Sequence, residues 1–292
     1  MPAASELEFP PIVLTFAASD PSGGAGVQAD ILTIASMGCH PLSVLTAITV
    51  QDTLGVEGVL ALDSEWVSDQ ARCLLEDMPV DAFKIGVLGS VENVTAIAEV
   101  LSDYPDVPVI LDPVLASGRG DELANDQMTR AMRDLLLPLT TILTPNSIEA
   151  RRLAETDDDD APTLAVCAER LIAAGVEYVL VTGTHEPTPQ VVNTLYAKSG
   201  IVRTDTWPRL PGTYHGSGCT LASAIAAMLG NGLEIPEAVR EAQDYTWHAL
   251  QKAYRPGMGQ YLPDRLFWAR EEAETRSDEA APAPLPDVRG SH

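Results

Sequence analysis

Short apolar stretches alternate along this chain with longer segments of helical periodicity, and this alternation constrains the fold more than any other feature. Within the apolar stretches hydrophobic residues follow one another directly, without the regular exchange of polar and apolar residues that marks a half-exposed strand. Strands of this kind are typical of parallel sheets whose connecting helices cover both faces. We therefore expect an α/β fold with three layers, α/β/α, and a mainly parallel central sheet.

The periodicity also places the individual elements. The expected strands share an apolar composition and occupy residues 12–17, 42–50, 82–87, 109–111, 141–143 and 178–181, followed by a hairpin at 191–195 and 201–206. The expected helices share apolar residues at helical spacing and occupy residues 25–37, 65–78, 91–104, 122–137, 147–155, 163–174, 218–229 and 236–254. Ser64 is the expected N-cap of the second of these helices.

Neither an internal repeat nor a linker interrupts residues 11–268, so we expect a single domain there. The residues after Arg270 are rich in Glu, Ala and Pro and lack apolar periodicity, which predicts a disordered acidic tail over 271–292. Residues 157–160 are consecutive aspartates, for which we expect a solvated loop.

The chain is strongly acidic. Among its 292 residues 18 are Lys or Arg and 42 are Asp or Glu, which gives a formal net charge of −24. Nucleic acids and anionic membranes require a basic surface, so we expect neither as a partner. No apolar stretch approaches the roughly 18 residues of a membrane span, and the first residues lack the basic region of a signal peptide. A ligand that carries phosphate would have to be held against this negative charge.

The cysteines lie far apart and form no CxxC pair, which favours free thiols in a reducing compartment over disulfides or a zinc site. We therefore expect a cytoplasmic protein. Cys39, Cys73 and Cys167 are expected to be buried structural thiols, which is the common fate of a free cysteine.

A first glycine-rich turn joins the first expected strand to its helix. It reads Ser19-Asp20-Pro21-Ser22-Gly23-Gly24-Ala25-Gly26. Glycines at such a junction let the backbone approach a ligand closely and present its N–H groups, although many turns of this kind are only tight turns. Asp30 follows in the first helical turn, near this loop. The glycines do not fit the G-x-G-x-x-G register, which argues against a dinucleotide-binding fold.

A second turn, Gly216-Ser217-Gly218-Cys219, comes immediately before a helix of small residues. The first N–H groups of a helix have no partner inside it, and the helix dipole adds positive potential at this end. The turn can therefore hold a phosphate or a developing negative charge without a lysine, and no Gly-Lys-Ser/Thr sequence occurs in the chain. Cys219 lies in the first helical turn, where we expect a lowered thiol pKa. The alternative is a buried structural cysteine.

Acidic and amide side chains follow two of the expected strands. Asp112 comes directly after residues 109–111, at the strand end where open parallel sheets bind ligands. Asn146 and Glu149 lie three residues apart across a helix start, so that both side chains can face a strand end. The alternative for this pair is a plain helix cap, with Glu149 favoured by the helix dipole.

In this order, the motifs resemble the hydroxymethylpyrimidine kinase/phosphomethylpyrimidine kinase family of thiamine biosynthesis, which belongs to the ribokinase-like superfamily. The resemblance extends over residues 11–268. The segments that carry it are residues 19–30, Thr46-Ala47 with Gln51-Asp52-Thr53, Lys84-Ile85-Gly86, Leu111-Asp112-Pro113-Val114, Leu143-Thr144-Pro145-Asn146 and His215-Gly216-Ser217-Gly218-Cys219-Thr220. No single segment is decisive, but the ordered set is specific.

The resemblance implies that ATP and Mg²⁺ are used to phosphorylate 4-amino-5-hydroxymethyl-2-methylpyrimidine and then its monophosphate. The residues that it implies as pyrimidine contacts are Ala18, Ala25, Asp30, Thr49, Gln51, Val87 and Val114. Gln51 carries the donor and the acceptor needed to read an aminopyrimidine edge, and Asp30 can accept a hydrogen bond from the substrate. The residues implied for the ATP–Mg region are Asp112, Asn146, Glu149 and Thr182, with Asp112 and Glu149 holding the metal through water.

The resemblance further assigns Gly216, Ser217 and Gly218 to an anion hole, and it places Cys219 where most of the superfamily carries an aspartate base. We therefore expect the N–H groups of this turn to stabilise charge on the transferred phosphoryl group. Cys219 is expected to take the proton of the attacking hydroxyl group. The resemblance also suggests a homodimer.

Two segments depart from the family pattern. Thr182-Gly183-Thr184-His185 replaces the common Lys-Gly-Gly-His, so phosphate binding is expected to depend more on backbone groups and Mg²⁺. Gly212-Thr213-Tyr214-His215 replaces Lys-Asn-Thr-His near the position expected for the second phosphoryl group. His215 itself has two interpretations, a loop hydrogen-bonder or a phosphate contact.

The sequence leaves three alternatives open. The first is a pyridoxal or pyridoxine kinase of the same superfamily, some members of which also carry the cysteine. Thr49 and Val87 stand where the family commonly has Val and Met, which leaves the selectivity of the pocket open. The second is a non-catalytic ligand-binding module on the same fold. The third is a nicotinamide-dependent oxidoreductase, which the absent dinucleotide motif argues against.

Overall fold

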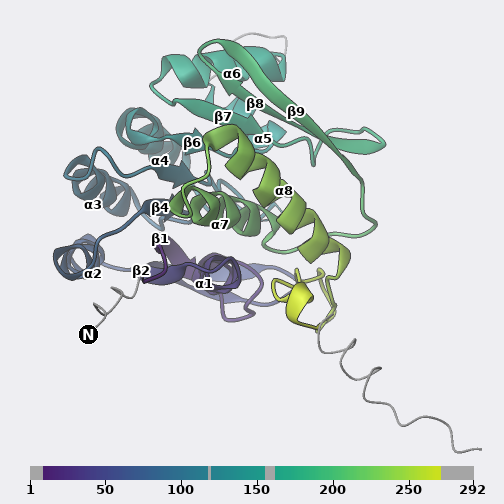
Figure 1. Cartoon of the computed structure of the whole chain (residues 1–292). Helices are drawn as coiled ribbons and strands as arrows, with labels where there is room; N and C mark the ends of the chain where they lie inside the picture. Colours follow the sequence, from purple (N-terminus) through teal and green to yellow (C-terminus); the bar gives the residue numbers. More distant parts are fainter. Residues whose placement is uncertain (1–8, 118–119, 155–161, 271–292) are drawn as a thin grey trace, which may run out of the picture.

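A computed structural model describes residues 9–117, 120–154 and 162–270. One sheet runs through the molecule in the strand order β3-β2-β1-β4-β5-β6-β7-β8-β9 (Figure 1). Its strands are β1 (Ile12–Ser19), β2 (His40–Gln51), β3 (Val56–Ala61), β4 (Ala82–Ile85), β5 (Val109–Leu111), β6 (Ile142–Leu143), β7 (Tyr178–Val181), β8 (Gln190–Ala197) and β9 (Gly200–Pro208). The pairs from β2 through β1 to β7 are parallel, whereas β3, β8 and β9 are antiparallel to their neighbours.

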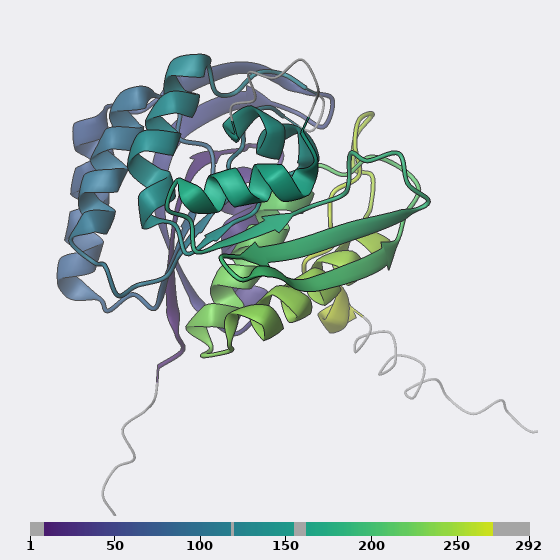
Figure 2. The same cartoon turned by 90° about the horizontal axis from the view of Figure 1, so that it is seen from above.

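Helices cover both faces of this sheet (Figure 2). On one face lie α1 (Gly26–Ser36), α7 (Ser217–Gly230) and α8 (Ile235–Gln251), packed around a buried core. On the other face lie α2 (Ser64–Asp77), α3 (Val91–Ser102), α4 (Asp126–Ala131), α5 (Ser147–Leu153) and α6 (Leu164–Ala173), around a second core. The expected three-layer α/β/α fold with a mainly parallel sheet is confirmed. In the part of the chain that the structure describes, no helix is long and apolar enough to cross a membrane.

Near the start of the sheet, one strand was not predicted and one predicted helix cap was wrong. Strand β3 was not expected, because this edge strand is largely exposed and contains Glu57 and Gly58 in place of an apolar run. The N-cap of α2 is Asp63 and not Ser64: the Asp63 side chain accepts a hydrogen bond from the N–H of Glu65 at 2.9 Å.

The helix expected over 122–137 is also different. It begins at Asp126, because the Asn125 side chain caps it by accepting from the N–H of Met128 at 2.9 Å. The helix then widens into a π-helical turn, Met132–Leu136, and ends in a 3-10 turn, Leu137–Leu139. The expectations for residues 157–160 and 271–292 lie outside the described residues.

The thiols expected to be buried differ in their surroundings. Cys39 and Cys167 are buried, as predicted, whereas Cys73 is exposed. The prediction was wrong for Cys73 because this residue lies on the outer side of α2, whose buried residues are Val67 and Ala71.

The strand order defines where a ligand can bind. β1 lies between β2 and β4, so the chain leaves β1 toward one side of the sheet and later returns on the other. In open parallel sheets the ligand crevice lies at such a point, outside the carboxyl ends of the strands. Ser19 ends β1, Gln51 ends β2 and Asp112 directly follows β5. Residues from distant parts of the sequence therefore meet at one edge of the sheet.

Candidate active site

A cavity of about 520 Å³ opens at this edge. It is lined by the predicted site residues Ala18, Ala25, Thr49, Gln51, Val87, Asp112, Val114, Asn146, Glu149, Thr182, Gly216, Ser217, Gly218 and Cys219. The two glycine-rich turns, the strand ends and the segment after β7 thus contribute to a single cavity. Asp30 is the predicted site residue that does not line it.

The turn before α7 depends on glycine at its first position. Gly216 has a φ of 80°, in the left-handed region, and a Cβ atom there would lie 1.9 Å from the backbone oxygen of Gly24. The backbones of the two glycine-rich turns therefore touch. The first N–H groups of α7 have no partner inside the helix. The residues that carry them line the cavity, which therefore also meets the positive end of the helix dipole. This arrangement suits an anionic group.

Cys219 does not have the expected lowered pKa. Burial raises the pKa of its thiol to about 12, because the nearby charge of Lys84 does not offset burial and the carboxylates of Asp112 and Asp30. The thiol also donates a hydrogen bond to the Asp112 carboxylate. The prediction from the helix dipole was wrong because it left out these neighbours, which are distant in sequence. Cys219 is therefore a thiol at neutral pH.

Two buried carboxyl groups, Asp112 and Glu149, share one side of the cavity. Burial raises the pKa of Asp112 to about 6, against the attraction of Lys84. Burial and the charge of Asp112 raise the pKa of Glu149 to about 8. Oδ2 of Asp112 is buried without a hydrogen-bond partner among the described residues. Paired carboxyl groups, one of which has an oxygen without a partner, suit a divalent cation that prefers oxygen ligands, so these residues fit Mg²⁺.

The capping interpretation of Asn146 and Glu149 is confirmed. The Asn146 side chain accepts from the N–H groups of Ile148 and Glu149, at 2.9 and 3.0 Å. In return, the Glu149 carboxylate accepts from the Asn146 N–H at 2.9 Å. This reciprocal capping box fixes both side chains at the start of α5. Both residues also line the cavity, so the cap and a site at this edge are compatible.

Asp30 is fully buried and does not line the cavity. Its carboxylate accepts from Thr15 Oγ1 at 2.6 Å and from Ser223 Oγ at 2.7 Å, and it forms an ion pair with Lys84 at 2.9 Å. Asp30 and Lys84 are both fully buried. A carboxylate with these partners has no free oxygen toward a ligand, so the expected substrate contact is corrected. Although burial opposes its charge, Lys84 keeps a raised pKa because Asp30 and other nearby anionic groups stabilise the ammonium.

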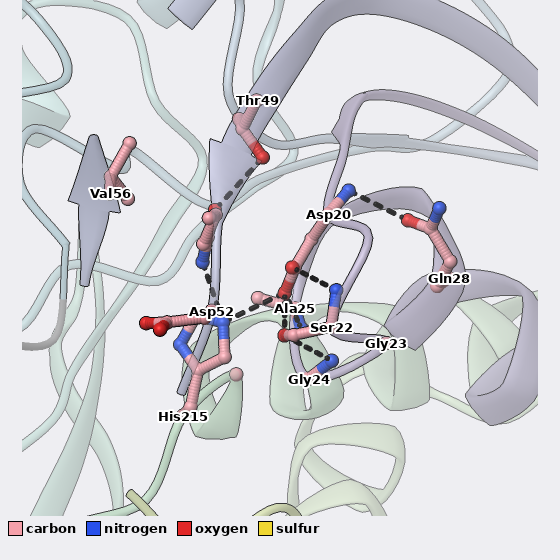
Figure 3. A network of polar contacts seen from close by, with 12 residues as sticks. Asp20, Ser22, Gly23, Gly24, Ala25, Gln28, Thr49, Asp52, Val56 and His215 are labelled. Atoms are coloured by element: carbon pink, nitrogen blue, oxygen red, sulfur yellow. Dashed lines mark hydrogen bonds and ion pairs between the residues drawn. The ribbon is translucent and has the colours of Figure 1, made fainter. Parts of the chain in front are cut away.

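A second polar network surrounds Asp20 (Figure 3). The Asp20 carboxylate accepts from the N–H groups of Ser22 and Ala25 at 2.9 and 2.8 Å, and thereby orders the first glycine-rich turn. It also lies 2.8 Å from Nε2 of His215. Although burial opposes its charged form, these hydrogen bonds hold the pKa of Asp20 below its ordinary value. Sequence reasoning missed this role of Asp20, because the partner lies in a distant loop.

Sequence comparisons show the family of the chain. Residues 20–264 match the family model described as phosphomethylpyrimidine kinase. The chain belongs to this family. It is 40% identical over 254 residues to the hydroxymethylpyrimidine/phosphomethylpyrimidine kinase of Streptomyces coelicolor, an alignment that covers 86% of this chain and 92% of that protein.

Solved structures show the same fold. The phosphomethylpyrimidine kinase from Clostridium difficile 630 is similar with a TM-score of 0.71 and 34% identity, over 82% of this chain and 99% of that one. The pyridoxal kinase from Staphylococcus aureus in complex with AMP-PCP and pyridoxal is similar with a TM-score of 0.79 and 28% identity, over 89% of this chain and 95% of that one. These similarities confirm the expected ribokinase-like architecture.

The sequence of this member of the phosphomethylpyrimidine kinase family did not predict the cavity wall near α8. The indole rings of Trp207 and Trp247 stack there with centroids 6.2 Å apart. Gln243 accepts from Asn193 Nδ2 at 2.9 Å, and the Asn193 side-chain oxygen accepts from the N–H of Gly183 at 3.0 Å. The sequence indicated only a hairpin and an amphipathic helix for these segments.

Arg209 holds the segment that departs from the family pattern after β7. Its guanidinium group donates to the backbone oxygens of Thr184, Glu186 and Thr188 at 2.8, 2.9 and 3.0 Å. Arg209 also lines the cavity, on the side of Thr182. The loop that lacks the family's lysine is therefore braced by an arginine from the end of β9.

Proposed function

We propose that this protein phosphorylates 4-amino-5-hydroxymethyl-2-methylpyrimidine with ATP, and then phosphorylates the monophosphate, in thiamine biosynthesis. A single ribokinase-like domain over residues 11–268 would carry both steps. The observation that supports this most is the meeting of an anion-binding turn, Gly216–Cys219, with the buried pair Asp112 and Glu149 and with Gln51 in one cavity. Membership of the phosphomethylpyrimidine kinase family supports the same substrate.

The cavity divides between the two substrates. Ala18, Ala25, Thr49, Gln51, Val87 and Val114 form a small, mostly apolar region that suits a methylated pyrimidine ring. Gln51 contributes the amide that can pair with an aminopyrimidine edge. The wall near α8, with Trp207 and Trp247, suits the adenine ring of ATP. The hydroxymethyl group and the γ-phosphate would then meet at the turn before α7.

Phosphoryl transfer depends mainly on positioning and on stabilising charge. The N–H groups of Ser217, Gly218 and Cys219 are placed to bind the phosphoryl oxygens. Mg²⁺, held by Asp112 and Glu149 through water, would supply further charge neutralisation. Cys219 is a thiol, so it can take the hydroxyl proton only while it passes its own proton on. Asp112, which accepts a hydrogen bond from this thiol, is the group placed to receive that proton in the same step.

A coupled assay of ADP release tests the proposal. The protein is given Mg-ATP with the pyrimidine alcohol, its monophosphate or pyridoxal in separate reactions. We expect turnover with the alcohol and with the monophosphate, and a much lower kcat/KM with pyridoxal. No turnover with either pyrimidine would refute the proposal.

Pyridoxal phosphorylation is the second candidate function. The observation that favours it is the fold similarity to the pyridoxal kinase from Staphylococcus aureus, at 28% identity. The higher identity to the kinase of Streptomyces coelicolor, 40%, favours the pyrimidine. A kcat/KM for pyridoxal equal to or above that for the pyrimidine would reverse this order.

A further inference from the structure

Arg265 is buried close to the two glycine-rich turns, outside the set of residues that line the cavity. It lies in the segment after α8, yellow in Figure 1, and is only 3% exposed. The backbone of this segment is fixed at two places. Tyr245 Oη donates to the Arg265 carbonyl oxygen at 2.7 Å, and the Asp264 N–H donates to the carbonyl oxygen of Ala249 at 2.9 Å. The position of Arg265 is therefore set by α8.

The guanidinium group of Arg265 contacts both turns at once. Nη2 donates to the backbone oxygen of Gly24 at 2.5 Å, and Nη1 donates to that of Gly23 at 3.4 Å. Nε donates to Oγ1 of Thr220 at 3.1 Å. The planar fork of arginine, with several donors in fixed directions, is what allows one side chain to make these contacts.

These contacts act on the anion-binding turn through its backbone. Thr220 Oγ1, which accepts from Arg265, donates in turn to the carbonyl oxygen of Gly216 at 2.8 Å. The Gly24 carbonyl oxygen, which also accepts from Arg265, occupies the space where a side chain of Gly216 would stand. Arg265 therefore fixes the spacing between the turn of residues 23–24 and the turn of residues 216–220.

Arg265 also differs from the other buried cation near the site. Lys84 has Asp30 as its ion-pair partner. Among the described residues Arg265 forms no ion pair, and its partners are two carbonyl oxygens and a hydroxyl group. Burial of a charge without a counter-ion is unfavourable. An anion bound at the N-terminus of α7 would offset this cost, because it would lie within the positive field of both the arginine and the helix dipole.

We propose that Arg265 is a positioning residue for the anion-binding turn, which holds the two glycine-rich turns in register and supplies a positive charge behind the bound phosphoryl group. The inference rests on the proposed phosphoryl-transfer function. Arg265 would also help to hold a phosphate group in a protein whose net charge is −24. The field of a buried cation without a counter-ion acts locally, whatever the charge of the surface.

The test uses variants of the full-length protein in which the exposed Cys73 is replaced by serine. Arg265→Met removes the charge and the donors but keeps much of the volume. Arg265→Lys keeps the charge but not the fork. Arg72→Met is the matched control, because Arg72 is exposed on α2, where it pairs with Asp103 at 3.0 Å, so the same charge is removed far from the cavity.

The first measurement needs no substrate. Thermal unfolding of each variant is followed at increasing concentrations of inorganic phosphate, and the protection by phosphate, measured as a rise in Tm, gives its affinity. In Arg265→Met we expect the phosphate concentration for half-protection to rise about 10-fold, because a charge that stabilises the bound anion is lost. The phosphate concentration for half-protection of Arg265→Lys should lie between the values of Arg265→Met and the control. Equal protection in Arg265→Met and Arg72→Met would overturn the proposal.

The second measurement is kcat and KM for Mg-ATP with the pyrimidine alcohol. We expect kcat of Arg265→Met to fall about 100-fold, the size seen when one preorganised charge-stabilising group is removed. Added guanidinium should restore part of kcat in a further variant, Arg265→Ala. A variant with lower thermal stability but unchanged kcat and phosphate protection would show a merely structural role and would also overturn the proposal.

Two further outcomes are decisive. Should Arg265→Met fail to fold, Arg265→Lys carries the test: weaker phosphate protection than in Arg72→Met supports the proposal, and equal protection overturns it. Absence of turnover in the Cys73→Ser parent contradicts the proposed function and leaves the phosphate measurement valid. Turnover in the parent together with an unaffected Arg265→Met contradicts only the inference about Arg265.

Discussion

Nε2 of His215 lies 2.8 Å from Oδ2 of Asp20 and 2.7 Å from the side-chain nitrogen of Gln51. An imidazole nitrogen carries either one proton or one lone pair, so it cannot satisfy both partners at the same time. The Asp20 carboxylate only accepts hydrogen bonds, which directs the proton of Nε2 toward Asp20. The amide of Gln51 is then fixed by its oxygen, which accepts from Thr49 Oγ1 at 3.0 Å, and its nitrogen stays available to donate to a ligand.

This relationship predicts the effect of His215→Ala. The variant should raise KM for the pyrimidine about 10-fold, the equivalent of one hydrogen bond between Gln51 and the substrate, because the Gln51 amide loses the ring that restricts where it can point. KM for Mg-ATP should change much less. Steady-state kinetics with each substrate varied in turn gives both values. An equal rise in both KM values would instead support the interpretation of His215 as a phosphate contact.

Gln51→Ala should raise KM for the pyrimidine far more than KM for ATP, because the amide is the polar group placed to pair with the ring edge. Gln51→Glu is the matched variant: it keeps the length of the side chain but removes the donor. The same kinetic measurements apply, and similar effects on both substrates in Gln51→Ala would refute the edge-reading role.

Cys219→Ala should keep the fold but lose most turnover, with kcat lower by about 100-fold or more if the thiol takes part in proton transfer. The exposed Cys73 offers the control, since Cys73→Ala should leave kcat unchanged. Circular dichroism and thermal melting establish that both variants are folded. An unchanged kcat in Cys219→Ala would exclude Cys219 as the base and leave Asp112 as the candidate.

The sequence predicted the architecture and most of the cavity because both follow from local patterns. Apolar strands that alternate with helices indicate a parallel sheet, and glycines at strand ends indicate close backbone approach, so the sequence alone was enough to place Gly216 and Asp112. The cap at Asn146 was also readable, since a capping box spans only a few residues.

The predictions that failed depend on partners that are far apart in sequence. The burial of Asp30 follows from Lys84 and Ser223, which lie 54 and 193 positions away. The raised pKa of Cys219 follows from burial and from the carboxylates around it, which outweigh the helix dipole that the sequence revealed. Edge strand β3 was missed because an exposed strand needs no apolar run.

Glu149 predicts a pH-dependent stability. Its pKa is raised from 4.5 to about 8, so the folded state binds the proton more tightly than the unfolded state. The resulting stabilisation is complete below about pH 4.5 and is lost as the pH rises through about 8, and each tenfold difference in proton affinity corresponds to about 1.4 kcal/mol. Glu149→Gln stays neutral and can still accept in the capping box. The variant should therefore gain stability relative to the parent as the pH rises from about 5 to about 8.5.

Urea unfolding at both pH values, with EDTA present to remove divalent ions, measures this difference. Glu99→Gln, on an exposed position of α3, removes the same charge and serves as control. A stability difference between Glu149→Gln and the parent that is the same at both pH values would contradict a raised pKa of Glu149 in the folded state.

Substitution of Asp30, the ion-pair partner of Lys84, tests whether this aspartate has a structural role or binds the substrate. Asp30→Asn would leave the fully buried ammonium of Lys84 without its carboxylate, which should lower the free energy of unfolding by about 3–5 kcal/mol. Asp103→Asn breaks an exposed ion pair with Arg72 and should cost about 1 kcal/mol or less.

A second variant shows whether the unpaired charge is the cause. Asp30→Asn combined with Lys84→Met should be more stable than Asp30→Asn alone, because the uncompensated ammonium is then absent. Urea unfolding of the three variants gives the free energies. If Asp30→Asn instead kept its stability and raised KM for the pyrimidine alone, Asp30 would act as a substrate contact and not as the structural partner of Lys84.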